Sequence, residues 1–172
     1  KMSTIIAGKY KGRNIRIRNL KNVRPTLARI KKSIFQILEP IENKNVLDLY
    51  SGTGSIGLEF LSRGASMVTM VERSRKLVSI LHKNISKIHL DNNYTIICND
   101  AIRFLNNNSN KYDIIFADPP YDTIEYLELK KKINSLLHNG GVFCMEMKKN
   151  KLFDNSIDVR VYGDSQVAIW KK

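Results

Sequence analysis

Apolar and polar positions alternate from residue 45 onward in a way that predicts strands and helices in turn. Short apolar runs predict strands at 46–50, 67–71, 94–98, 112–117 and 142–147. Between them, apolar residues at helical spacing predict helices that end near 63, cover 74–89 and 101–105, and run near 124–137. Because alternating strands and helices build a parallel sheet that is covered on both faces, the pattern predicts an α/β fold.

The N-terminal segment shows the period-two alternation of a β-hairpin. Residues 3–7 and 13–18 flank a glycine-bracketed turn, and in the second run isoleucines alternate with arginines, so one face of the hairpin is basic. A helix is expected to follow, with Thr26 as its cap and Pro40 as its stop.

A second hairpin is expected at the C-terminus, from residues 157–162 and 166–170. It adds an antiparallel edge to the mostly parallel sheet. The chain is therefore expected to comprise a small basic hairpin and helix, residues 1–40, and an α/β domain, residues 41–172.

Positive charge is concentrated in the first 40 residues. The chain has 29 Lys and Arg against 16 Asp and Glu, a net charge of +13. Residues 1–40 hold 11 of these basic residues and one acid, for a net charge of +10, and five of the 11 are arginines. A basic segment on a nearly balanced body predicts RNA or DNA as the partner, rather than a membrane. The residues of this segment that are expected to contact the nucleic acid are Arg13, Arg16, Arg18 and Lys32.

The cysteines, histidines and apolar runs give no sign of a disulfide, a metal site or a membrane span. Cys98 and Cys144 lie in apolar strand-like runs, so both are expected to be buried free thiols of a cytoplasmic protein. The three histidines show no metal-ligand spacing, and no metal site is expected. No apolar run is long enough to cross a bilayer, and a monomer without a membrane partner is expected.

A glycine-rich turn and three acidic residues stand at the ends of consecutive predicted strands. Asp48 lies just before a turn with G-x-G-x-x-G spacing at 52–57, whose glycines let the backbone approach a ligand. Glu72 follows the first of these glycines by 20 residues, where a carboxylate can accept both hydroxyls of a ribose. Asp100 can accept from an adenine amino group or cap the next helix. By itself this series fits an NAD enzyme as well as an S-adenosylmethionine enzyme.

The tetrapeptide Asp118-Pro119-Pro120-Tyr121 follows the fourth predicted strand and distinguishes between these cofactors. An aromatic amine is a poor nucleophile because its lone pair is delocalised into the ring. The Asp118 carboxylate and the Pro119 carbonyl can hold the amine hydrogens, the prolines stiffen the loop, and Tyr121 offers a face on which an extruded base can stack. The motif predicts methyl transfer from S-adenosylmethionine to an exocyclic amine of a nucleic-acid base, with these four residues as the catalytic loop.

Four blocks of sequence resemble the RsmD-type family of bacterial 16S ribosomal RNA guanine-N2 methyltransferases. They are residues 5–13, 24–29, 46–65 and 118–121, and the ending at 162–164 also looks like this family. The first two blocks point to this family rather than to base methyltransferases at large. The resemblance implies a Rossmann-like methyltransferase fold and one target guanine in 16S ribosomal RNA. It further implies an assembled or assembling small subunit as the substrate.

The resemblance also implies roles for individual residues. The cofactor site, with S-adenosylhomocysteine as product, is expected at Asp48, Ser51, Gly52, Gly54, Glu72, Arg73, Asp100 and Ala101. Residues near the active-site mouth, facing RNA, are expected to be Arg24, Thr26 and Arg29. Residues 1–40 then form an RNA-facing extension of a catalytic domain at 41–172.

Two other function classes stay open. DNA adenine or cytosine amino-methyltransferases use a similar loop but usually carry a target-recognition domain, for which this chain has only its basic N-terminal segment. A non-catalytic RNA-binding assembly factor could use the same scaffold, although the intact loop at 118–121 argues against it. An NAD dehydrogenase is disfavoured because 172 residues leave little room for a separate catalytic domain. Guanine rather than adenine rests on the resemblance alone.

Overall fold

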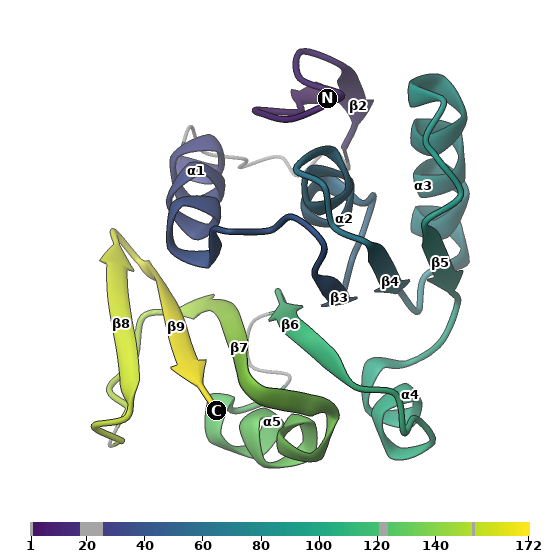
Figure 1. Cartoon of the computed structure of the whole chain (residues 1–172). Coiled ribbons are helices and arrows are strands. Elements are labelled where there is room, and N and C mark those ends of the chain that lie inside the picture. The colour runs from purple at the N-terminus through teal and green to yellow at the C-terminus, as the bar shows by residue number, and fades with distance from the viewer. Residues whose placement is uncertain (1, 18–25, 121–123, 153) are drawn as a thin grey trace.

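The computed structural model describes residues 2–17, 26–120, 124–152 and 154–172 (Figure 1). Its elements, in chain order, are β1 (Met2–Thr4), β2 (Asn14–Arg16), α1 (Thr26–Leu38), β3 (Asn45–Leu49), α2 (Ser55–Ser62), β4 (Met67–Val71), α3 (Arg75–Ile88), β5 (Tyr94–Ile97), α4 (Ala101–Asn106), β6 (Tyr112–Ala117), α5 (Tyr126–Ile133), the 3-10 turn η1 (Asn134–Leu136), β7 (Leu137–Lys148), β8 (Ile157–Tyr162) and β9 (Ser165–Lys171).

One seven-stranded sheet has the order β5-β4-β3-β6-β7-β9-β8. The pairs from β5 to β7 are parallel, whereas β9 pairs antiparallel with both β7 and β8. The expected mostly parallel α/β sheet with a C-terminal antiparallel hairpin is thus confirmed. The chain builds outward from β3 to β5 and then returns to place β6 on the other side of β3. Such a switch in strand order opens a crevice at the carboxyl ends of the strands, where ligands of α/β sheets bind.

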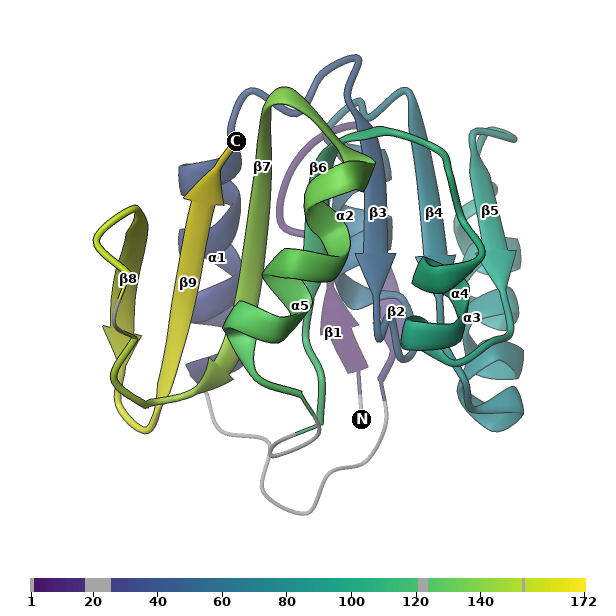
Figure 2. The ribbon, with the colours of Figure 1, turned by 90° about the horizontal axis from the view of Figure 1, so that it is seen from below.

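Helices cover both faces of this sheet. The β1–β2 hairpin, α1, α2 and α3 lie on one face, and α4 and α5 lie on the other (Figures 1 and 2). Alternate residues along each strand face the two helical layers. Val46 belongs to the hydrophobic cluster on the α1–α3 face, and Leu47 belongs to the cluster on the α4–α5 face. This period-two division gives every residue at a strand end a defined face.

The N-terminal hairpin shares its core with the sheet domain. Ile5 and Ile15 are buried in the same cluster as residues of α1, α2 and β3, while Arg16 points to solvent. The alternation predicted for this segment therefore holds where it is described, and Arg18 lies outside the described residues. The boundary near residue 40 stays a prediction, since no separate cluster of buried residues marks it.

A buried carboxylate joins the hairpin and α1 to α2. Glu59 has no exposed surface, and its oxygens accept from the backbone amides of Ile6 at 2.9 Å and Ala7 at 3.0 Å. The same carboxylate pairs with Lys31 of α1 and with Arg63, each at 2.9 Å. Burial lowers the pKa of Lys31, and the charge of Glu59 opposes that effect. Four donors from three segments converge on this one side chain.

Two local expectations were wrong. Cys144 is buried as expected, but Cys98 is exposed, because β5 is an edge strand and the residue lies just past its end. The last helix ends at Ile133, and β7 begins at Leu137 rather than near 142. In the sequence, Gly140 and Gly141 before Val142 predict a turn. In the sheet the two glycines accommodate an irregularity, where the pairing with β6 shifts register between Tyr112 and Ile114.

We predict that Glu59→Gln lowers the free energy of unfolding by about 3–5 kcal/mol, because Lys31 then keeps a buried charge without a counter-ion and Arg63 keeps only the half-exposed Glu39. Urea denaturation followed by circular dichroism measures the change. Glu39→Gln is the matched control, since Glu39 pairs with the same Arg63 at 2.7 Å but is 46% exposed. That variant should lose less than about 1 kcal/mol. Equal losses in the two variants would contradict the anchoring role of Glu59.

Candidate active site

The candidate site lies at the carboxyl edge of the parallel strands. The arrowheads of β3, β4, β5 and β7 point to the same edge in Figure 2. The predicted glycine turn, Glu72, Asp100 and the loop beginning at Asp118 follow β3, β4, β5 and β6 in that order. The fold therefore brings together side chains that are up to 70 residues apart in the chain.

The glycine turn after β3 is held by hydrogen bonds to the neighbouring strand. The Ser51 amide donates to Val71 O at 3.0 Å, and its hydroxyl donates to Asp48 O at 2.8 Å. Gly52 and Gly54 both have positive φ, of 58° and 87°. A side chain on Gly54 would collide with Leu81, whereas one on Gly52 would meet only a backbone oxygen 4.0 Å away. Gly54 is thus required by internal packing, and Gly52 leaves its backbone open to a ligand.

Glu72 shapes this turn directly. The side chain is buried at the end of β4, and its carboxylate accepts from the amides of Gly52 at 2.9 Å and Ser74 at 2.8 Å. Each carboxylate oxygen keeps a further lone pair for a ligand hydroxyl. Arg73, the next residue, is exposed. The structure therefore assigns Glu72 a role in holding the turn, which is compatible with the predicted ribose contact.

Asp100 caps a helix, as one of its two predicted roles required. Its Oδ1 accepts from the amides of Ile102 and Arg103, both at 3.0 Å, at the start of α4. The residue is exposed, and Ala101 beside it is buried. A carboxylate that uses one oxygen for the cap retains the other for a ligand.

Asp48 is a buried carboxylate under the glycine turn. It is 1% exposed, and within the described segments no group donates to its Oδ2. Loss of hydration raises its pKa, and the charges of Asp118 and Glu72 raise it further, while the Gly57 amide acts in the opposite direction. A side chain on Gly57 would come within 2.9 Å of this oxygen. This oxygen is enclosed by the protein, so Asp48 acts on a ligand through its electrostatic field rather than by direct contact.

Asp118 follows the last residue of β6, and its amide donates to Leu49 O at 3.4 Å, so the loop is tied to β3. The residue is open to solvent, yet protein atoms crowd its surroundings, and the resulting loss of hydration raises its pKa to about 6. Pro119 is buried and Pro120 is exposed. Both border a small pocket of about 50 Å³ with Met145 and Met147. Tyr121 lies outside the described residues.

Sequence reasoning missed Glu146, on the neighbouring strand β7. It is half-buried and the only acid in that strand. Burial, and then the charge of Asp118, raise its pKa to about 8. An isolated acid in a run of apolar residues was the available signal, but nothing in the sequence shows which strand pairs with β6.

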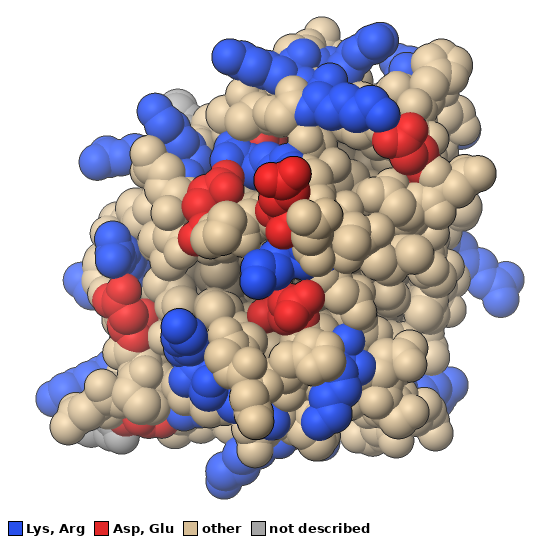
Figure 3. Space-filling model, in the orientation of Figure 1, with Lys and Arg blue, Asp and Glu red and all other residues tan. Residues whose placement is uncertain are grey.

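The predicted RNA contacts are exposed where the structure describes them: Arg13, Arg16, Arg29 and Lys32. In Figure 3, basic side chains crowd the end of the molecule formed by the β1–β2 hairpin, whereas acidic and basic groups are mixed elsewhere on that face. Arg18 and Arg24 lie outside the described residues. Thr26 is the first residue of α1, and its side chain is not described. The contacts of all these residues with RNA stay predictions.

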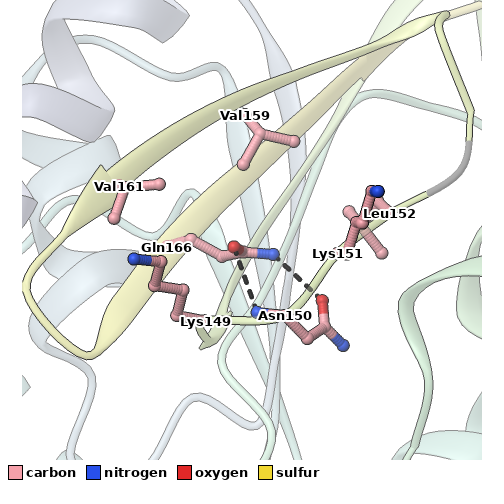
Figure 4. Close-up of a pocket in the computed structure, with 7 residues that line it drawn as sticks. All are labelled: Lys149, Asn150, Lys151, Leu152, Val159, Val161 and Gln166. Atoms are coloured by element: carbon pink, nitrogen blue, oxygen red, sulfur yellow. Dashed lines mark hydrogen bonds between the residues drawn. The ribbon is translucent and has the colours of Figure 1, made fainter.

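A larger pocket lies beside the carboxyl end of β7, and Asn150 lines both it and the small pocket next to Pro119. It has a volume of about 520 Å³ and lies between the chain after β7 and the β8–β9 hairpin (Figure 4). Gln166 and Asn150 hydrogen-bond across it at 3.1 and 3.2 Å, and Val159 and Val161 line its outer wall. None of the predicted site residues lines this pocket.

The described part of the chain shows neither a cluster suited to a metal nor a membrane-spanning helix. Within residues 2–17, 26–120, 124–152 and 154–172, no three His, Cys, Asp or Glu side chains are grouped to hold a metal ion. In the same segments, no helix has both the length and the apolar character needed to span a membrane.

The arrangement of a Gly turn, acidic strand ends and an Asp-Pro-Pro loop on this sheet defines a Rossmann-like methyltransferase. The chain belongs to the family described as "Conserved hypothetical protein 95", whose model matches residues 3–171. The resemblance to the RsmD-type family is thereby confirmed, because curated relatives in this comparison are named ribosomal RNA small subunit methyltransferase D.

Two of these relatives come from Buchnera aphidicola subsp. Acyrthosiphon pisum and Escherichia coli K12. The first is 37% identical over 86% of this chain and 80% of its own length. The second is 33% identical over 79% of this chain and 67% of its own length. Both values show membership of the family over most of the chain.

Solved structures share the fold. The putative methyltransferase yhhF from Escherichia coli has a TM-score of 0.88 and 24% identity, covering 100% of this chain and 98% of its own. The Thermus thermophilus 16S rRNA N2 G1207 methyltransferase RsmC, in complex with AdoMet and guanosine, has a TM-score of 0.73 and 20% identity. It covers 100% of this chain and 50% of its own. At identities of 24% and 20%, these similarities show a shared fold alone.

We predict that kcat/KM for methyl transfer falls as pH drops through about 6, the raised pKa of Asp118, because the protonated carboxyl is a weaker acceptor and cannot take the proton that the amine loses. With an ordinary aspartate pKa, the loss would begin near pH 4. Asp118→Asn keeps an acceptor but does not titrate, so any residual activity should lose this acidic limb. An unchanged profile in Asp118→Asn would assign the limb to another group.

Proposed function

We propose that this methyltransferase moves a methyl group from S-adenosylmethionine to the N2 amine of a guanine in 16S ribosomal RNA. Its proposed substrate is an assembled or assembling small subunit, and it acts as a monomer in the cytoplasm. The observation that carries the proposal is the Asp118-Pro119-Pro120 segment at the carboxyl end of β6, one strand from the glycine turn. Family membership and the names of the curated relatives support ribosomal RNA as the acceptor.

The residues around the glycine turn fit S-adenosylmethionine. The cofactor, when bound, supplies an electrophilic methyl group on a positively charged sulfonium. The open backbone at Gly52 and the spare acceptor capacity of Glu72 and Asp100 suit its ribose and adenine. The unpaired Asp48 oxygen and the charge of Asp118 suit a cationic ligand. The full set proposed to hold it is Asp48, Ser51, Gly52, Gly54, Glu72, Arg73, Asp100 and Ala101.

The catalytic loop prepares the amine of the base. Asp118 accepts a hydrogen bond from the amine, as does the Pro119 carbonyl, and this orients the nitrogen lone pair out of the ring plane. Pro119 is buried and both prolines have a restricted φ, so these acceptors are held in place before the base arrives. Asp118 is also the nearest proposed base for the proton that the nitrogen loses. Stacking of the base on Tyr121 remains part of the proposal.

A labelled-methyl assay tests this function. Purified protein is incubated with labelled S-adenosylmethionine and small-subunit particles from cells that lack the modification, and the product is identified by mass spectrometry. We expect label on the N2 atom of one guanine. We expect Asp118→Ala to reduce transfer by at least about 100-fold while binding of S-adenosylhomocysteine persists.

Parallel reactions separate the alternatives. Transfer to duplex DNA in place of particles would support a DNA amino-methyltransferase. Failure to bind S-adenosylhomocysteine would support a non-catalytic assembly factor. Near-normal activity of Asp118→Ala on particles would refute the assigned catalytic role without removing the proposed substrate.

Removing the charge of the hairpin should weaken RNA binding. We predict that Arg13→Ala/Arg16→Ala lowers affinity for small-subunit RNA and reduces the slope of log K against log salt by roughly 1–2, because each phosphate contact releases counter-ions. Filter binding at several salt concentrations measures the slope. The control is Lys131→Ala, an exposed charge on α5, on the opposite face of the sheet. An equal slope in all three proteins would exclude the hairpin as the contact.

A further inference from the structure

Glu146 and Asp118 occupy neighbouring positions on adjacent parallel strands. The last pair in the β6–β7 ladder is Ala117 with Met145, and each of the two acids is the next residue on its own strand. Adjacent strands lie about 4.8 Å apart, so the two residues lie side by side at the edge of the sheet.

Both side chains also project to the same face. Phe116 and Cys144, two residues earlier on each strand, belong to the cluster under α1–α3. Ala117 and Met145 belong to the opposite cluster. Period-two alternation therefore places Asp118 and Glu146 together on the α1–α3 face. On the same face, Asp48 pairs directly with Phe116 across the β3–β6 ladder.

A second carboxylate at this position is costly for the free protein. Burial and the Asp118 charge both raise the pKa of Glu146. In the part of the chain that the structure describes, no Lys, Arg or His pairs with it. Asp48, which is 1% exposed and has an Oδ2 that no described group satisfies, lies on the same face but two residues earlier along the strands, level with Phe116 and Cys144. At this edge of the sheet, carboxylate acceptors outnumber the hydrogen-bond donors of the described residues. A ligand that brings N–H donors is therefore favoured.

Among the bases that carry an exocyclic amine, only guanine has a second N–H donor next to it. Guanine presents N1–H beside its N2 amine. Adenine presents a lone pair at N1 and cytosine one at N3, each of which Glu146 repels when it is ionised, above its raised pKa of about 8. Two adjacent acceptors on two strands match the two adjacent donors of guanine and reject the other two bases.

We propose that Glu146 is the residue that selects guanine, accepting N1–H of the target base while Asp118 accepts from the N2 amine. The inference rests on the proposed function and adds the residue that distinguishes guanine from adenine. Glu146 acts as a specificity residue that touches the base beside the reacting amine.

Binding of nucleosides tests this role separately from transfer. Guanosine and 2-aminopurine riboside both carry the N2 amine, but the second has a lone pair at N1. In the presence of S-adenosylhomocysteine and above pH 8, where Glu146 is ionised, wild type should prefer guanosine by at least about tenfold, measured by calorimetry or ligand-observed NMR. Glu146→Gln offers an amide N–H to that lone pair, so it should bind 2-aminopurine riboside at least as well as guanosine. Glu146→Ala should bind the two nucleosides equally.

Two controls keep the interpretation specific. Glu42→Gln, an exposed acid in the segment before β3, should keep the wild-type preference. Unchanged affinity for S-adenosylhomocysteine shows that the Glu146 variants are folded. On small-subunit particles, both Glu146 variants should lose at least about tenfold in kcat/KM.

The outcomes separate the two proposals. If wild type methylates particles but Glu146→Gln and Glu146→Ala retain its preference for guanosine, the role of Glu146 is overturned and the proposed function stands. If wild type binds 2-aminopurine riboside as tightly as guanosine, guanine selection by Glu146 fails, and if it transfers no methyl group to a guanine N2 of the particles, the guanine N2 assignment fails as well. A shift in preference confined to the Glu146 variants supports the proposal.

Discussion

The buried carboxylate of Glu59 is the interaction on which the placement of the N-terminal segment depends. It accepts from the backbone of the hairpin and from Lys31 of α1, and it also pairs with Arg63 at the end of its own helix. A buried charge that is fully paired and hydrogen-bonded imposes a specific geometry, because moving the hairpin or α1 away leaves buried polar or charged groups without partners. The basic hairpin is thereby held on the same face of the sheet as Asp118 and Asp48, rather than attached as a free tail.

The second feature is an excess of acceptors at the carboxyl edge of the sheet. Asp48, Asp118 and Glu146 come from three adjacent strands, and burial or mutual repulsion raises the pKa of each. Such a cluster destabilises the free protein, since hydration is lost without full compensation. A cationic cofactor and an amine-bearing base supply the missing positive charge and N–H groups. The same groups that weaken the fold are therefore the ones suited to the proposed reaction.

The glycine turn shows how packing and ligand binding divide one motif. Gly54 and Gly57 are fixed by contacts with Leu81 and with Met70 and Asp48, and both contacts lie inside the protein. Gly52 has open space beside it and donates its amide to Glu72. The spacing of the motif is therefore set mainly by the meeting of α2 with β4 and α3, and one glycine remains for the ligand. Glu72 connects internal packing with ligand binding, because its carboxylate holds the turn in place through the Gly52 amide.

The sequence alone determined the order of strands and helices, and it placed the proposed catalytic loop at the end of a strand. These follow from periodicities of two and 3.6 residues and from proline and glycine positions, which are local properties. The boundaries of β7 and the exposure of Cys98 were mispredicted because they depend on a register shift and on which strand lies at the edge. Only the tertiary structure placed Glu146 beside Asp118 and Glu59 under the hairpin. Strand pairing and burial join residues far apart in the chain, and no local pattern records those distances.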